Sequence, residues 1–119
     1  MESMKKVDRK ALALQREIER IKKELTELGD LRPGSLSRQY NVCGKPGCRC
    51  KASPPEKHGP YYQVSYTRKG RSSSKFVRQE QVASVKRQLR NYTKLRQLVD
   101  RWIEAGAELS NLLLEEERG

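Results

Sequence analysis

The chain has 119 residues, of which 34% are hydrophobic and 34% are charged, and its formal net charge is +11. This length fits one domain, and so small an apolar fraction predicts helices packed on helices rather than a deep globular core. Residues 1–30 contain no apolar run of membrane length and no signal-peptide pattern, so we expect a cytoplasmic protein without a membrane partner.

Residues 5–28 are predicted to form an amphipathic helix with a heptad seam. Its apolar positions recur at alternating spacings of four and three residues, which is typical of a coiled coil. Gly29 suits the position after a helix, and Pro33 prevents the helix from resuming. An ordinary surface helix is the alternative, and the sequence leaves open whether the seam packs within the chain or between chains. The seam consists of Val7, Ala11, Leu14, Ile18, Ile21, Leu25 and Leu28.

Residues 32–60 are interrupted by nine prolines and glycines. At this density of helix and strand breakers we expect no long element. An irregular segment of this length needs something that holds it in one shape. The same segment contains every cysteine and the only histidine of the chain, namely Cys43, Cys48, Cys50 and His58.

These four residues have the donor types of a closed structural zinc site. The spacing C-x4-C-x-C-x7-H is not a common zinc-finger spacing, but three thiolates and one imidazole make a complete tetrahedral Cys3His set. A disulfide fits poorly, because three cysteines cannot pair evenly and cytoplasmic thiols stay reduced. An iron–sulfur cluster and a catalytic cysteine with His58 as base are further alternatives. We expect one structural Zn²⁺ per chain, which contributes folding free energy to the segment.

Residues 61–78 are predicted to form a β-hairpin. Apolar and polar side chains alternate from Tyr62 to Tyr66, and Gly70 in the turn is free to take a positive φ angle. Two strands alone are marginally stable, so the hairpin needs a brace. Tyrosines in such a strand either form a small core or stack on nucleic-acid bases. We expect Tyr62 and Tyr66 on the inner side, and the place of Tyr61 stays open.

Residues 80–117 contain no proline and are predicted to form one long helix. Beside a main apolar stripe through Leu95, Leu98, Trp102 and Leu109, the helix carries a second stripe, so its apolar face is wider than one partner helix would cover. A bundle that includes the N-terminal helix and a second copy buries both stripes, so we expect a homodimer. An intramolecular antiparallel helix pair is the alternative. The expected dimerisation residues are Leu14, Ile18, Ile21, Leu25, Leu95, Leu98, Trp102 and Leu109.

The positive charge is concentrated in the middle of the chain. Residues 32–96 carry 16 Lys/Arg against 2 Asp/Glu, whereas residues 97–119 carry 2 against 6. This imbalance indicates a polyanionic partner, and we expect a nucleic acid, although a plain solvated face is the alternative. The candidate contact residues are Lys45, Arg49 and Lys51 near the cysteines, Arg68, Lys69, Arg71, Lys75 and Arg78 around the hairpin, and Lys86, Arg87 and Arg90 on the long helix.

The motifs CGKPGCRC at residues 43–50 and HGPYY at 58–62, followed by the turn at 69–71, resemble a family of small bacterial proteins of unknown function. The similarity extends over about residues 31–105. Members of that family are similar to companions of mobile elements, encoded near transposases or in phages. The resemblance implies zinc binding by the three cysteines and the histidine, and it favours DNA over RNA. It implies no catalytic activity.

The sequence therefore predicts a mainly helical α+β protein with a helix at 1–30, a zinc knuckle and hairpin at 31–79, and a long helix at 80–119. The expected function is that of a non-enzymatic, zinc-containing, nucleic-acid-binding accessory or regulatory protein of a mobile element or phage. The alternative is an interaction module that docks on a recombinase, transposase or other nucleoprotein machine. An enzyme is disfavoured, because no clustered carboxylates and no second histidine accompany the metal motif.

Overall fold

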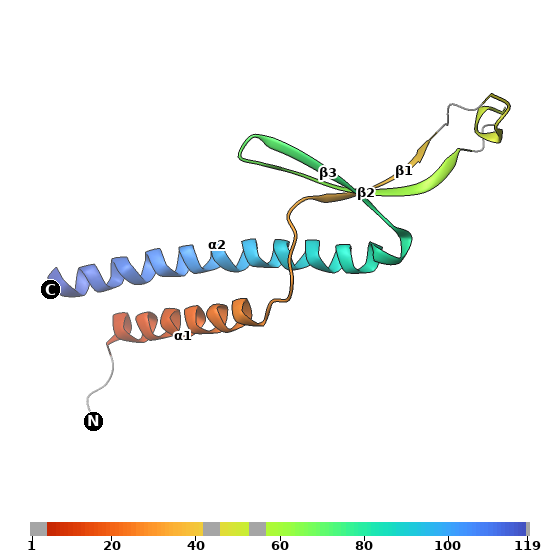
Figure 1. Cartoon of the computed structure of the whole chain (residues 1–119). Coiled ribbons are helices and arrows are strands. Elements are labelled where there is room, and N and C mark those ends of the chain that lie inside the picture. The colour runs from red at the N-terminus through yellow and green to blue at the C-terminus, as the bar shows by residue number, and fades with distance from the viewer. Residues whose placement is uncertain (1–4, 42–45, 53–56, 119) are drawn as a thin grey trace. The chain divides into compact units, whose positions relative to one another are not determined.

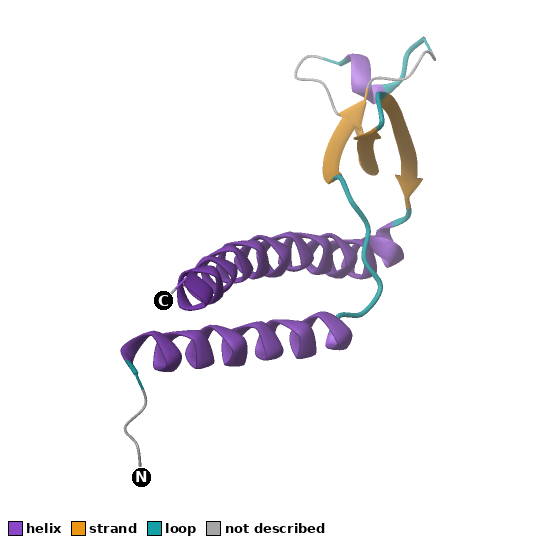
Figure 2. Cartoon of the chain, turned by 90° about the vertical axis from the view of Figure 1, so that its left-hand side faces the viewer, coloured by secondary structure: helices purple, strands orange, loops and turns teal. Residues whose placement is uncertain are grey.

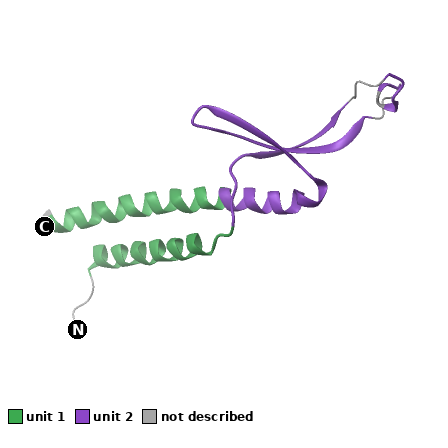
Figure 3. Ribbon diagram, in the orientation of Figure 1, with its two compact units in different colours: residues 1–29, 93–119 green, residues 30–92 purple. Residues whose placement is uncertain are grey.

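The computed structural model describes residues 5–41, 46–52 and 57–118. The elements in chain order are α1 (Lys6–Glu27), β1 (Ser35–Asn41), the 3-10 turn η1 (Arg49–Lys51), β2 (His58–Arg68), β3 (Arg71–Val77), the 3-10 turn η2 (Gln79–Gln81) and α2 (Val82–Arg118), as Figure 1 shows. The predicted α+β class with mainly helical content is confirmed. Two compact units divide the chain: residues 1–29 with 93–119 form unit 1, and residues 30–92 form unit 2 (Figure 3). The helix α2 contributes residues to both units. None of the described helices is both long enough and apolar enough to cross a membrane.

Unit 1 is an antiparallel pair of helices from one chain, in which α1 lies beside the C-terminal part of α2 (Figure 2). Leu14, Ile18 and Ala105 form its buried core, and Ile21 has no exposed surface. The heptad seam predicted for α1 is therefore the face that packs on α2. Partly buried side chains that complete this core are Trp102, Leu109 and Leu112.

Exposed ion pairs flank the apolar seam of unit 1. The Lys10 ammonium donates to the Glu108 carboxylate at 2.9 Å, and this hydrogen bond raises the pKa of Lys10. Near the middle of α1, Arg101 lies 3.6 Å from Glu17. Solvent-exposed pairs of this kind contribute little to stability, so the apolar seam is what holds the two helices together.

Unit 2 is built on a three-stranded antiparallel sheet in the order β1-β2-β3. Leu36 is opposite Val64, and Tyr62 is opposite Val77, so these four side chains share one face of the sheet. The first turns of α2 cover this face with Val82, Val85 and Leu89. Tyr62 packs against this core and Tyr66 is half-buried, which agrees with the inner position expected for both.

The predicted hairpin between β2 and β3 is confirmed. Arg68 pairs with Arg71, and the two residues between them, Lys69 and Gly70, have φ angles of 51° and 76°. Two consecutive positive φ angles are typical of the type I′ turn, whose twist matches that of the flanking strands. The sequence indicated the positive angle at Gly70 but not the one at Lys69.

The expectation that residues 32–60 contain no long element is wrong over Ser35–Asn41, which form β1. The breakers cluster at Pro33 and Gly34 and resume at Gly44, so the residues between them are free to extend. Pairing of β1 with β2 supplies the brace that the hairpin needs. β2 also begins earlier than predicted, at His58 rather than at residue 61.

The entry to β1 requires glycine at position 34. Gly34 has a φ angle of +119°, and a Cβ atom there would overlap the Ser65 carbonyl oxygen and lie 3.0 Å from Tyr66 Cβ. We expect Gly34→Ala to lower the free energy of unfolding by about 2 kcal/mol or more, measured by urea titration. Gly70→Ala is the matched control, since its φ angle is +76° but nothing lies within 4 Å of the added methyl group. We expect the control to lose about 1 kcal/mol, and equal losses in the two variants would contradict the close approach at Gly34.

Candidate metal centre and basic surface

Cys48 and His58 lie in contact at one end of the sheet. Cys48 directly precedes η1, and His58 is the first residue of β2, where it pairs with Asn41 of β1. The Cys48 Sγ atom is 3.1 Å from the His58 Nε2 atom, and both residues are half-buried. Cys43 lies outside the described residues, and of Cys50 only the backbone, which belongs to η1, is described. The structure thus brings together two of the predicted zinc ligands.

The geometry of this pair fits part of a tetrahedral zinc site. A thiolate and an imidazole nitrogen bound to one Zn²⁺ at about 2.3 Å and 2.0–2.1 Å lie about 3.5 Å apart. The observed separation of 3.1 Å is about 0.4 Å shorter than this value, a difference that a small rotation of either side chain makes up, and it also suits a hydrogen bond between a thiol and an imidazole. Among residues 5–41, 46–52 and 57–118, no group of three or more potential ligands occurs. The fit therefore depends on the Cys48–His58 pair and on the chemistry of the donor set.

The predicted nucleic-acid contacts divide between the two ends of β2. Arg68, Lys69 and Arg71 are exposed at the hairpin turn. Arg49 and Lys51 are exposed on η1, beside the metal residues, whereas Lys45 lies outside the described residues. β2 extends from His58 to Arg68, a span of about 33 Å at 3.3 Å per residue, so the two groups of cations are far apart (Figure 1). The sequence had assigned these cations to separate groups near the cysteines and around the hairpin, but it gave no distance between the groups.

The remaining predicted contacts lie along the hairpin and the start of α2. Lys75 is opposite Val64, on the sheet face that α2 covers, and its side chain is exposed. Arg78 is exposed before η2, where its backbone N–H donates to Gln81 Oε1 at 3.0 Å. The side chains on α2 that point away from the core of unit 2 include Lys86, Arg87 and Arg90, which are all exposed.

The net charge of the protein belongs entirely to unit 2. Residues 30–92 contain 14 Lys/Arg and 3 Asp/Glu, whereas residues 1–29 and 93–119 together contain 12 of each. Unit 1 is therefore neutral, and unit 2 carries the full +11. The boundaries between the two compact units therefore also separate the neutral part of the chain from its basic part.

One basic feature of β1 was not predicted. The Arg38 guanidinium carbon lies 5.3 Å from the centroid of the Tyr40 ring, and Arg38 also donates to the Tyr40 hydroxyl. This hydrogen bond raises the pKa of Arg38, which keeps its positive charge. Both side chains are exposed, so they add a cation and an aromatic ring to the surface of unit 2. Arg38 and Tyr40 are two residues apart, so they share one face of a strand. This signal within residues 36–40 is recognisable only once β1 is identified as a strand.

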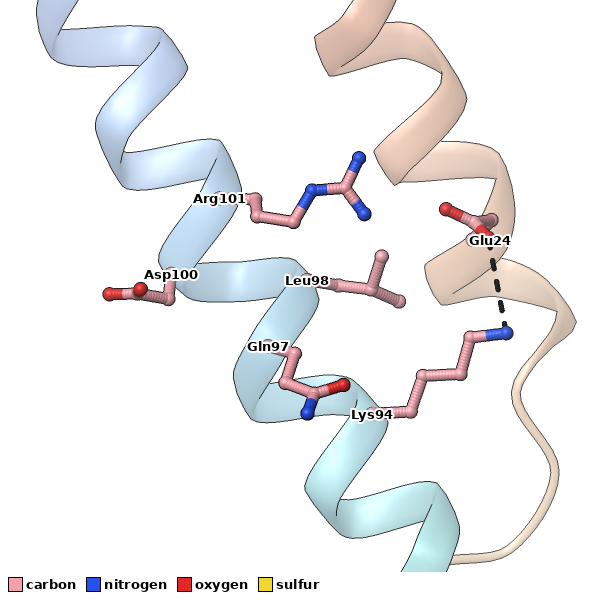
Figure 4. A pocket seen from close by; sticks show the side chains of 6 residues that line it. All are labelled: Glu24, Lys94, Gln97, Leu98, Asp100 and Arg101. Carbon is pink, nitrogen blue, oxygen red and sulfur yellow. Dashed lines mark ion pairs between the residues drawn. The ribbon is translucent and has the colours of Figure 1, made fainter.

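A pocket of 320 Å³ lies in unit 1, between α1 and α2. Figure 4 shows Lys94 reaching toward Glu24, with which it forms an ion pair of 3.9 Å, and Asp100 pointing away from α1. The two acidic side chains that line this pocket, Glu24 and Asp100, therefore do not converge on one point. Lys94, Glu24 and Arg101 link the helices, and the pocket is the space between these links.

The dimerisation residues predicted from the sequence are accounted for by packing within one chain. Leu14, Ile18, Ile21 and Leu98 are buried in the helix pair of unit 1. The other four, Leu25, Leu95, Trp102 and Leu109, are half-buried. The second stripe of α2, formed by Val99, Ile103 and Leu113, stays exposed: Val99 is 39% exposed and Ile103 is 63% exposed.

One protein family, described as a domain of unknown function (DUF6788), matches residues 11–87. The match begins in α1, contains the whole sheet and ends in the first turns of α2. No curated protein and no solved structure matches the chain. Because the matched segment is more than half of the 119 residues, this protein belongs to the DUF6788 family of domains of unknown function.

Proposed function

We propose that this protein is a zinc-containing nucleic-acid-binding accessory protein without catalytic activity. The observation that carries the proposal is the confinement of the net charge to unit 2. A protein that is basic only to remain soluble has no need to separate a neutral unit from a unit of charge +11. Cations on one folded unit are the electrostatic signature of binding to a phosphate backbone.

The metal has a structural role in this proposal. Cys43, Cys48, Cys50 and His58 would hold one Zn²⁺, which closes the segment between β1 and β2. A closed site with four protein ligands has no open coordination position, so the ion supplies folding free energy rather than chemistry. Cytoplasmic DNA of a mobile element or phage is the proposed partner, and the choice of DNA and of this setting depends on the resemblance of the CGKPGCRC and HGPYY motifs.

The proposal is tested by equilibrium binding of the full-length protein to duplex DNA, single-stranded DNA and RNA over a salt series. We expect binding at physiological salt, with an affinity that falls linearly on a log–log plot as salt increases. Absence of binding to all three at low salt would refute the function. In that case the alternative, docking on a recombinase or transposase, would have to use protein contacts.

We further propose that a second copy binds to unit 1 through α2. Val99, Trp102, Ile103 and Gly106 line a hollow of 390 Å³, and a Cβ at Gly106 would have only Trp102 within 4 Å. An antiparallel contact with the α2 of another chain, centred near Gly106, places Glu116 and Glu117 close to Arg96 of the other copy. This complementarity of charge favours self-association over an unrelated partner.

Replacing Ile103 by Glu is expected to convert the dimer to a monomer, because a carboxylate would be desolvated in the contact. Sedimentation or light scattering measures the mass, and Asn111→Glu, also exposed on α2 but outside the hollow, is the control. A native protein that is monomeric up to about 0.1 mM would rule out the dimer.

A further inference from the structure

The sheet of unit 2 has a second face, opposite the one that α2 covers. By the strand register, Gln63 on this face is opposite Phe76 in β3 and Ser37 in β1. Its other members follow from the alternation of side chains along each strand. The positions on this face are Ser35, Ser37, Gln39, Tyr61, Gln63, Ser65, Thr67, Ser72, Ser74 and Phe76, and none of them is charged.

Two aromatic rings are exposed on this neutral face. Phe76 is 62% exposed and Tyr61 is 37% exposed. Tyr61 precedes Gln63 by two residues, and Gln63 is directly opposite Phe76, so the two aromatic residues are diagonal neighbours. Diagonal neighbours lie about 7–8 Å apart, close enough for both rings to contact one ligand. The apolar core on the other face uses neither ring.

Hydrogen-bonding groups surround the two rings. The Gln39 amide donates to the Gln63 side-chain oxygen at 3.5 Å, and the Ser37 hydroxyl donates to the Gln63 carbonyl oxygen at 3.3 Å. Nearer the hairpin turn, the hydroxyls of Thr67 and Ser72 are 2.9 Å apart. Neutral amides and hydroxyls both donate and accept, so they match the edges of bases and sugars without selecting one charge.

The cations that bind phosphate lie at the end of the same hairpin. Thr67 and Ser72 form the last pair of the neutral face, and the next pair is Arg68 and Arg71 at the basic turn, five residues along β2 from Gln63. Arg68 and Arg71 alternate to the other face, so their long side chains reach a strand on the neutral face only around the tip of the hairpin. A stacking surface next to a group of cations is the arrangement with which proteins hold unpaired nucleotides. A duplex hides the faces of its bases, so it would contact the turn but not the rings.

We propose that this face, with Phe76 and Tyr61 as stacking platforms, binds single-stranded nucleic acid. The proposal rests on the proposed nucleic-acid-binding function and specifies its substrate. In this proposal the cations of the turn bind phosphates of any nucleic acid, whereas the two rings stack only on unpaired bases.

The test compares an oligothymidine and an oligouridine of about 15 nucleotides with a duplex of the same length. We expect Phe76→Ala to weaken single-strand binding by about 5- to 100-fold and to leave duplex binding unchanged, with a smaller loss of the same kind for Tyr61→Ala. Phe76→Trp should retain the affinity for single strands, whereas Phe76→Leu should lose it although it keeps an apolar side chain. Leu114→Ala, which shortens a 49% exposed side chain in unit 1, is the control for loss of apolar surface.

Crosslinking gives a second readout that does not depend on how well a variant folds. Irradiation of the native protein with a bromouracil-substituted single strand should label the peptide that contains Phe76 or Tyr61. Suppose that Phe76→Ala weakens the binding of neither single strands nor duplex, or of both equally, and that the crosslink lies outside the peptide with Phe76 or Tyr61. The stacking surface is then refuted, while nucleic-acid binding stands. If the native protein binds neither single strands nor duplex, the proposed function fails as well.

Discussion

Replacing His58 by Ala, or Cys48 by Ser, is expected to abolish stoichiometric zinc binding and to expose the residues around η1 to proteases. Each change removes one member of a four-ligand set, and structural zinc in small domains contributes apparent binding free energies of about 10–16 kcal/mol that are also folding free energy. The native protein should contain close to one zinc per chain by elemental analysis. Removing the ion with a chelator should reproduce the protease sensitivity of both variants.

The same experiment distinguishes the metal from a plain hydrogen bond between Cys48 and His58. A neutral hydrogen bond contributes about 0.5–1.5 kcal/mol and does not respond to a chelator. Lys57→Ala, next to His58 but without a ligand atom, is the matched control and should keep its zinc. A metal-free native protein whose digestion pattern is unaffected by chelator would disprove the zinc site.

Neutralising the hairpin turn is expected to have the largest effect on nucleic-acid affinity. Arg68, Lys69 and Arg71 are exposed at one tip, and each phosphate contact adds about 0.9 to the slope of log affinity against log salt. The triple Gln variant should therefore lower the slope by up to about 3 and the affinity near 0.1 M salt by about 100-fold. Fluorescence anisotropy over a salt series measures both quantities.

The control for this variant removes the same charge from unit 1. Arg16, Arg20 and Lys23 are exposed on α1, so their triple replacement by Gln lowers the net charge equally without touching unit 2. The control should keep both the slope and most of the affinity. Equal losses in the two triple variants would mean that total charge, rather than the turn, determines binding.

The helices were the most predictable part of this fold, because their signals are local. A heptad seam and Gly29 placed α1 within one residue of its observed ends, Lys6 and Glu27. β1 was missed, because a strand with the sequence SLSRQYN has little apolar character of its own and is stabilised by pairing with β2, which is distant in the chain. The positive φ angle of Lys69 is equally non-local, since the twist of the strands imposes it.

In the candidate site, the features that depend on composition could be predicted from the sequence, and those that depend on distances in the fold could not. The concentration of cysteine and histidine in one segment was enough to predict that Cys48 and His58 meet, as they do at 3.1 Å. The distance between the two groups of cations could not be predicted without the length of β2. This strand places Lys51 and Arg68 near its opposite ends. Phe76 is the main apolar residue of the returning strand in the sequence, and only the register with Gln63 shows that it lies on the exposed face.

The order β1-β2-β3 leaves two of the three strands with one open edge each. Unpaired backbone groups on such edges are templates for strand addition and aggregation, and long charged side chains are a common protection against it. Arg38 on β1 and Lys75 on β3 are exposed side chains of this kind, so we expect them to repel the same strands of a second molecule. A polyanion bound as proposed would neutralise the same charges, so complexes with excess nucleic acid should be more prone to edge-to-edge assembly than the free protein.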